Sequence, residues 1–153
     1  AALGVLASML GRRIGSGLTW ALFLLSGSLG NAVNAWAQAP DHLSVGASTG
    51  VFGLIGVLAG GAGRAQRQSR AQVLLLALGF GFGFLAMLGA GEERVDLGAH
   101  LFGLLCGLPF GLLVGNWRGA HGWKVWLNAM AGAAGAVLTF WAWATALAGP
   151  GWF

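Results

Sequence analysis

Apolar residues gather along this chain in long runs, and polar or turn-forming residues separate each run from the next. A helix needs about 17 to 25 mostly apolar residues to cross ~30 Å of hydrocarbon. The runs that reach this length are 17–38, 45–63, 72–91, 95–115 and 125–147. The pattern therefore predicts an all-α protein, a polytopic bundle of transmembrane helices.

The opening stretch, AALGVLASML, is apolar but shorter than these runs. As a helix it would extend only ~15 Å, about half of a bilayer. It has no initiator methionine, charged leader or small-residue cleavage site. We therefore expect the chain to begin inside a helix and to be a piece that lacks at least one upstream helix.

Composition agrees with the membrane class, because 57% of the residues are hydrophobic and only 8% are charged. The net charge is +4, but the basic residues are scattered between the runs and form no basic face. This argues against a nucleic-acid partner. The single cysteine, Cys106, lies inside an apolar run, where we expect a small buried role without redox or metal chemistry.

The charges also predict an orientation. If the runs cross a bilayer alternately, all four acids fall on one side and seven of the eight Lys and Arg on the other. Short cytoplasmic loops carry the excess of Lys and Arg, so the basic side is predicted to be cytoplasmic. The basic residues on that side are Arg12, Arg13, Arg64, Arg67, Arg70, Arg118 and Lys124.

One short motif suggests hydrolytic chemistry. In VGASTGVFG, Gly46, Ser48 and Gly50 have the GxSxG spacing that presents a nucleophilic serine in soluble hydrolases. A soluble α/β-hydrolase is excluded, because no strand-loop-helix alternation surrounds Ser48. Ser48 lies ~24 Å along its predicted helix from Arg64, and His100 lies ~26 Å along a parallel helix from Trp117. The two side chains are therefore predicted at nearly the same depth, near the outer surface.

Glycines indicate how these two helices meet. They recur every four residues at Gly103, Gly107, Gly111 and Gly115, and again at Gly56 and Gly60. Such spacing permits close backbone approach in membranes. His100 precedes the first of these stripes, and an ionisable group in a membrane span is expected to face a polar cavity or a partner.

At this point the residues resemble a family. GASTGVFGLIG, followed by VDLGAHLFGLLCG, resembles the serine and histidine segments of the rhomboid intramembrane serine proteases, and RRIGSG is similar to the turn before their third helix. The resemblance implies that Ser48 is the nucleophile and His100 the general base. It also implies supporting roles for Gly46, for Phe52 against the histidine ring, and for Gly103 and Gly107 between the helices.

The sequence departs from the family at two positions and leaves a third feature untested. Gly11 stands where a charged residue often begins the turn before the third helix. Thr49 follows the serine, where the family has a small residue. The family's oxyanion-stabilising His and Asn would precede Ala1 and cannot be named, so we expect little proteolysis from residues 1–153 alone. We predict a partial rhomboid core over 1–115, starting within its second helix, and an additional transmembrane helix within 116–153.

The predicted activity is that of an intramembrane serine endopeptidase that cleaves transmembrane segments of membrane proteins. A serine hydroxyl needs a base to accept its proton, and a neutral imidazole with a reference pKa of ~6.5 suits that role. The backbone N–H groups of Ser48 and Thr49, at a helix N-terminus, are predicted to hold the oxyanion. Asp96 is expected to be a helix N-cap, with a triad acid as its alternative.

The expected location is a bacterial inner membrane, with several passes and the active site towards the outer face. The partners expected are the lipid bilayer and transmembrane substrates, and no cofactor or metal is expected. Two alternatives stay open: a non-catalytic rhomboid-like protein that binds membrane partners, and a small transporter.

Overall fold

A computed structural model describes residues 2–38, 47–89, 96–115 and 122–149, and within these ranges all regular structure is helical. The predicted runs appear as five helices whose ends lie within three residues of the predicted ends. The opening stretch is also helical and continues to Ile14. In chain order the helices are α1 Ala2–Ile14, α2 Ser16–Ala37, α3 Ser48–Ala65, α4 Arg70–Gly89, α5 Leu97–Val114 and α6 Gly122–Ala148.

Within the described ranges, two helices are long and apolar enough to cross a membrane. They are α5, over Leu97–Val114, and α6, over Val125–Ala148. Helix α2 is interrupted by polar residues, and three of these, Thr19, Ser26 and Asn34, are buried. Average hydropathy therefore underrates a helix whose polar side chains face other helices, while Leu25 and Leu29 face outward.

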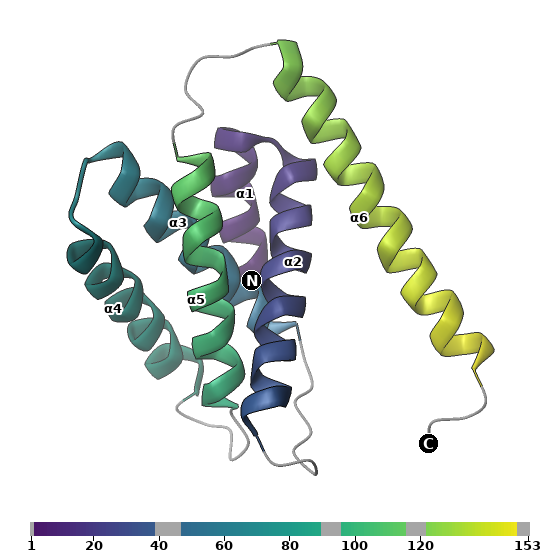
Figure 1. Cartoon of the computed structure of the whole chain (residues 1–153), viewed down its shortest axis with the longest axis horizontal. Coiled ribbons are helices and arrows are strands. Elements are labelled where there is room, and N and C mark those ends of the chain that lie inside the picture. The colour runs from purple at the N-terminus through teal and green to yellow at the C-terminus, as the bar shows by residue number, and fades with distance from the viewer. Residues whose placement is uncertain (1, 39–46, 90–95, 116–121, 150–153) are drawn as a thin grey trace.

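Helices α2, α3 and α5 form the centre of the bundle (Figure 1). Helix α3 packs most extensively against α5, and α2 packs against both. Helix α1 covers α2 and α3, while α4 and α6 lie on opposite flanks. The main core cluster contains Leu10, Leu22, Phe23, Leu54 and Val57, so it joins α1, α2 and α3.

The predicted close approach of two glycine-bearing helices is confirmed for α3 and α5. A Cβ built on Gly103 would collide with the Thr49 carbonyl oxygen, and one on Gly107 with the Gly53 carbonyl oxygen. Gly111 meets Val57 in the same way. Opposite residues thus differ by a constant 54 positions, so the two helices run in the same direction. Any side chain in this stripe would force the helices apart.

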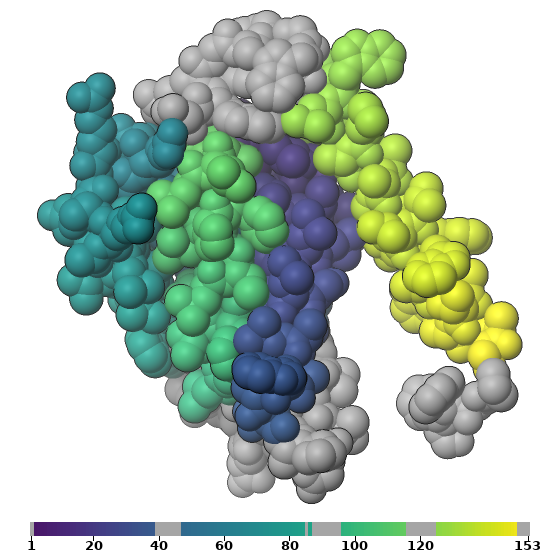
Figure 2. Space-filling model, viewed as in Figure 1, coloured from purple at the N-terminus to yellow at the C-terminus, as the bar shows by residue number. Residues whose placement is uncertain are grey.

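Helix α6 docks on α2 through a polar contact. The Leu18 N–H, in the first turn of α2, donates to Asn128 Oδ1 at 3.0 Å. This bond satisfies an amide that lacks an acceptor within its own helix. Farther along, α6 diverges from α2 and stands apart from it in the space-filling view (Figure 2).

Candidate active site

Ser48 is the first residue of α3 and is exposed. The preceding residue, Ala47, has no side chain that could cap the helix. The N–H groups of the first helical turn have no acceptor within the helix, and the partial positive charge of the helix end favours an anion there. A nucleophilic hydroxyl and potential oxyanion donors thus lie at one helix terminus.

His100 lies in the first turn of α5 and is only 8% exposed. Asp96 fixes the start of this helix, because its Oδ1 accepts a hydrogen bond from the Ala99 N–H at 3.0 Å. Its Oδ2 accepts a second bond from Asn34 Nδ2 on α2 at 2.8 Å. The expected N-cap role of Asp96 is confirmed. The Asn34 contact adds a tie between α2 and the turn that carries His100.

The His100 ring packs against an aromatic side chain from α3. It stacks on Phe52 with ring centroids 4.4 Å apart and an interplanar angle of 27°. Phe84 of α4 meets Phe52 edge-on at 5.9 Å. The imidazole plane is therefore set by packing. Its Nδ1 is buried and has no hydrogen-bond partner in the described part of the chain.

The register of α3 against α5 places Ser48 and His100 at nearly the same depth, as predicted. With the constant difference of 54, Ser48 lies opposite Phe102, and His100 is two residues nearer the helix start. Two residues correspond to ~3 Å along a helix axis. No hydrogen bond joins Ser48 to His100 among the residues that the structure describes.

Thr49 is accommodated at the junction of α2, α3 and α5. Its side chain is buried, and its Oγ1 donates to Asn31 Oδ1 of α2 at 2.8 Å. A Cβ on Gly30 or on Gly103 would crowd the Thr49 Cγ2. Glycines on both neighbouring helices thus make room for a residue larger than the small one found in the family that the sequence resembles. The Thr49 side chain, which is unusual for the family at this position, therefore ties the start of α3 to α2.

An apolar cavity of about 260 Å³ lies beside His100, between α4 and α5. Phe52, Leu78, Phe82, Leu101 and Leu104 contribute to its wall. Phe80 and Phe82 are 68% and 62% exposed, as expected for aromatic side chains that face lipid. Phe84 differs from that expectation, because it is half-buried against Phe52. The histidine therefore borders an apolar recess rather than bulk solvent alone.

Not every expected site residue can be placed. Gly46 lies outside the described residues, so its expected role stays a prediction. The contacts of Asn31 with Thr49 and of Asn34 with Asp96 were not predicted. The only signal for them was two amide side chains near the end of an apolar run, which does not specify partners.

The fold and its apolar helices define an all-α membrane protein. The family model described as Rhomboid domain matches residues 1–117, and the chain therefore belongs to the rhomboid family. This match covers α1 to α5. No curated protein and no solved structure matches the chain.

Proposed function

We propose that this rhomboid protein is an intramembrane serine endopeptidase in which Ser48 is the nucleophile and His100 the general base. One observation carries the proposal: an exposed serine at a helix N-terminus lies at the depth of a buried histidine on the parallel, closely packed neighbour helix. The family is one of membrane proteins that are commonly intramembrane proteases, which supports the same assignment.

The proposed reaction follows from these two side chains. Ser48 Oγ attacks the carbonyl carbon of the scissile peptide bond, and its proton passes to the His100 imidazole. The tetrahedral intermediate collapses, and the imidazolium gives that proton to the leaving amine. Water then hydrolyses the acyl-enzyme by the same route. The Phe52 ring holds the imidazole plane during these transfers.

The oxyanion would be held in part by the backbone of Ser48 and Thr49. Their N–H groups belong to the first turn of α3, where no intrahelical acceptor competes for them. Donors fixed before the reaction stabilise developing charge without reorganisation, and loss of one typically lowers the rate by about 10² to 10³. The Thr49 side-chain bond to Asn31 holds this turn in place.

The proposed substrates are transmembrane segments of other membrane proteins. A substrate helix must expose its backbone before attack, so segments with Gly or Pro near the cleavage point and a small residue at that point are preferred. We place the protein in a bacterial inner membrane, with several passes and the site end facing outward. The basic residues at the opposite helix ends support this orientation.

A non-catalytic, partner-binding rhomboid protein is the second candidate. The absence of a Ser48 to His100 hydrogen bond within the described ranges is the observation that favours it. Dyads without substrate are often loose, however, and tighten only in the complex. The two candidates differ in whether Ser48 reacts.

The test is reaction of the full-length protein, rather than residues 1–153 alone, in liposomes with a serine-directed phosphonate and with a model transmembrane substrate. We expect labelling at Ser48, and loss of both labelling and cleavage in Ser48→Ala and His100→Ala. Ser28→Ala is the matched control, because Ser28 is an exposed serine on α2. Labelling that survives Ser48→Ala would refute the assignment, and a folded chain without any labelling would favour the binding protein.

A further inference from the structure

A second cavity lies at the opposite end of the bundle from Ser48, where α3 ends and α4 begins. Its volume is about 430 Å³. Arg64, Arg67 and Arg70 contribute to its lining, together with Gln68. Leu74 of α4 and Leu108 and Leu112 of α5 form an apolar wall. The cavity therefore combines a strongly positive rim with a hydrophobic side.

The three arginines have no acidic residue nearby in the sequence. The chain contains only four acids, Asp41, Glu92, Glu93 and Asp96. Asp96 caps the start of α5, at the far end of that helix from Leu108 and Leu112. The other three belong to the segments that join α2 to α3 and α4 to α5. Asp96 is thus the only acid among the described residues, and it lies at the opposite end of the bundle from this positive rim.

The backbone that carries the arginines is held firmly. Helix α3 ends in a Schellman motif, because the Gln68 N–H donates to the Gly63 carbonyl at 2.9 Å. Helix α4 begins with a capping box, in which the Ser69 N–H donates to Gln72 Oε1 at 3.0 Å and the Gln72 N–H to Ser69 Oγ at 3.3 Å. The rim of the cavity is therefore preorganised.

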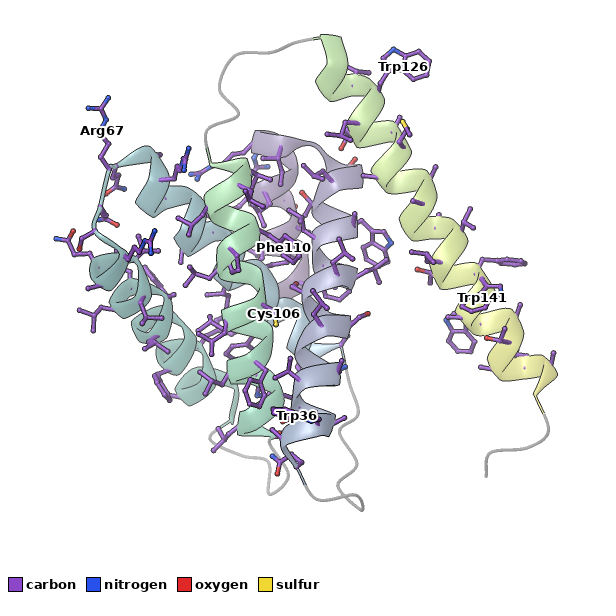
Figure 3. The ribbon with its side chains drawn as sticks, in the orientation of Figure 1. Trp36, Arg67, Cys106, Phe110, Trp126 and Trp141 are labelled. Atoms are coloured by element: carbon purple, nitrogen blue, oxygen red, sulfur yellow. The ribbon has the colours of Figure 1, made fainter. Side chains whose placement is uncertain are left out.

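Arg67 occupies the one position of this junction where glycine would be favoured. Its φ is 54°, in the left-handed region, and it is the only non-glycine residue of the described ranges with positive φ. Its side chain extends away from the α3 and α4 end of the bundle (Figure 3). The Schellman motif requires this left-handed conformation at the residue that Arg67 occupies, so the turn fixes where the Arg67 guanidinium leaves the backbone.

We propose that this cavity binds one anionic phospholipid, with its phosphate at the arginine rim and an acyl chain along Leu74, Leu108 and Leu112. Arginine pairs with phosphate through its planar fork of donors, and basic pockets between membrane helices suit anionic headgroups. Gln68 Oε1 is buried without a hydrogen-bond partner among the described residues, and an amide there can meet a headgroup hydroxyl.

A lipid fits this cavity better than a free phosphate ion. A phosphate ion would leave the leucine wall uncovered, whereas an acyl chain removes that wall from water. The proposal relies on the multi-pass arrangement, which puts the junction of α3 and α4 at a membrane surface. It does not depend on the proposed Ser48 and His100 chemistry.

The test is native mass spectrometry of the full chain released from vesicles of phosphatidylcholine mixed with phosphatidylglycerol. We expect one retained phosphatidylglycerol molecule. Each arginine near a membrane surface contributes about fivefold to anionic-lipid binding, so Arg64→Gln and Arg70→Gln should each reduce retention by about that factor. Arg67→Gly should reduce retention while raising the thermal midpoint in pure phosphatidylcholine, because it relieves the positive φ.

Controls separate this site from general attraction to the membrane and from the protease site. Arg12→Gln removes the same charge from the last turn of α1, outside this cavity, and should leave retention unchanged. Ser48→Ala should also retain the lipid, whatever its effect on proteolysis. An equal loss in Arg12→Gln, no retained lipid, or displacement by inorganic phosphate alone would overturn the proposal.

Discussion

Asp96 shows how one side chain can link two helices beside a reactive group. Its two carboxylate oxygens accept bonds from the Ala99 N–H and from Asn34 Nδ2. The first bond caps α5 and the second ties that cap to α2. Because His100 follows within one turn, this linkage bears on where the imidazole lies, although the Nδ1 of the ring has no partner in the described part of the chain.

We predict that Asp96→Asn retains most proteolytic activity, whereas His100→Ala abolishes it. Asparagine keeps one acceptor for the cap and loses part of the Asn34 tie, so the free energy of unfolding should fall by about 1 kcal/mol. The measurement is cleavage rate alongside thermal unfolding in the same detergent. A folded Asp96→Asn variant as inactive as His100→Ala would replace the dyad with a triad.

The ring contact between Phe52 and His100 predicts a second effect at this scale. Phe52→Leu should keep most of the buried volume but lose the stacking, lowering kcat/KM by about two- to tenfold. Phe80→Leu is the control, because Phe80 is largely exposed on α4. Steady-state cleavage of a model substrate measures both variants. Equal activity in the two would show that the stacked ring does not position the base.

At the scale of elements, the seam between α3 and α5 determines the register of the site. Glycines on both helices let backbone meet backbone, with Gly56 facing the Leu104 carbonyl and Gly107 facing that of Gly53. In a membrane, helices associate by such close packing rather than by a hydrophobic driving force. A shift of one turn along this seam would separate Ser48 from the level of His100.

We predict that Gly107→Ala destabilises the protein, because the new Cβ would collide with the Gly53 carbonyl oxygen. Overpacking of this kind costs about 1–3 kcal/mol. Gly79→Ala makes the same chemical change on α4, where a Cβ meets nothing within 4 Å. That control should be neutral or more stable by up to ~1 kcal/mol. The measurement is the thermal midpoint of each variant in detergent. A lower midpoint for Gly107→Ala alone would show that packing, and not helix propensity, requires glycine there.

At the scale of the whole molecule, the two ends of the bundle differ in character. Arg64, Arg67 and Arg70 lie at one end, and Ser48, His100 and Asp96 at the other. Each central helix connects these two ends, so an orientation in the membrane assigns a side to both the proposed protease site and the proposed lipid site. The distribution of charge favours a cytoplasmic arginine end.

This orientation predicts which introduced cysteines react in intact cells. In a Cys106→Ala background, Gln38→Cys at the end of α2 should label with a membrane-impermeant maleimide. Gln66→Cys, at the end of α3, should label only after the membrane is permeabilised. Both glutamines are exposed, so access to the reagent is comparable. The reverse labelling pattern would invert the proposed topology.

The sequence by itself determined the helices, the all-α class and the match in depth between Ser48 and His100. The helices and the class follow from the lengths of the apolar runs, and the match in depth follows from the numbers of residues that separate Ser48 from Arg64 and His100 from Trp117. The N-cap at Asp96 is local in the same sense, since a carboxylate just before a helix can reach only that helix's first amides.

Only the tertiary structure decided which faces of the helices meet. Asn34 reaches Asp96 and Asn31 reaches Thr49 across 62 and 18 positions of sequence, and no spacing rule pairs them. Phe84 packs on Phe52, whereas Phe80 and Phe82 of the same helix stay exposed. The rotation of α4 about its own axis decides which of these three identical side chains faces α3. The arginine cavity likewise exists only because the ends of α3, α4 and α5 converge, which is a property of packing and not of any one segment.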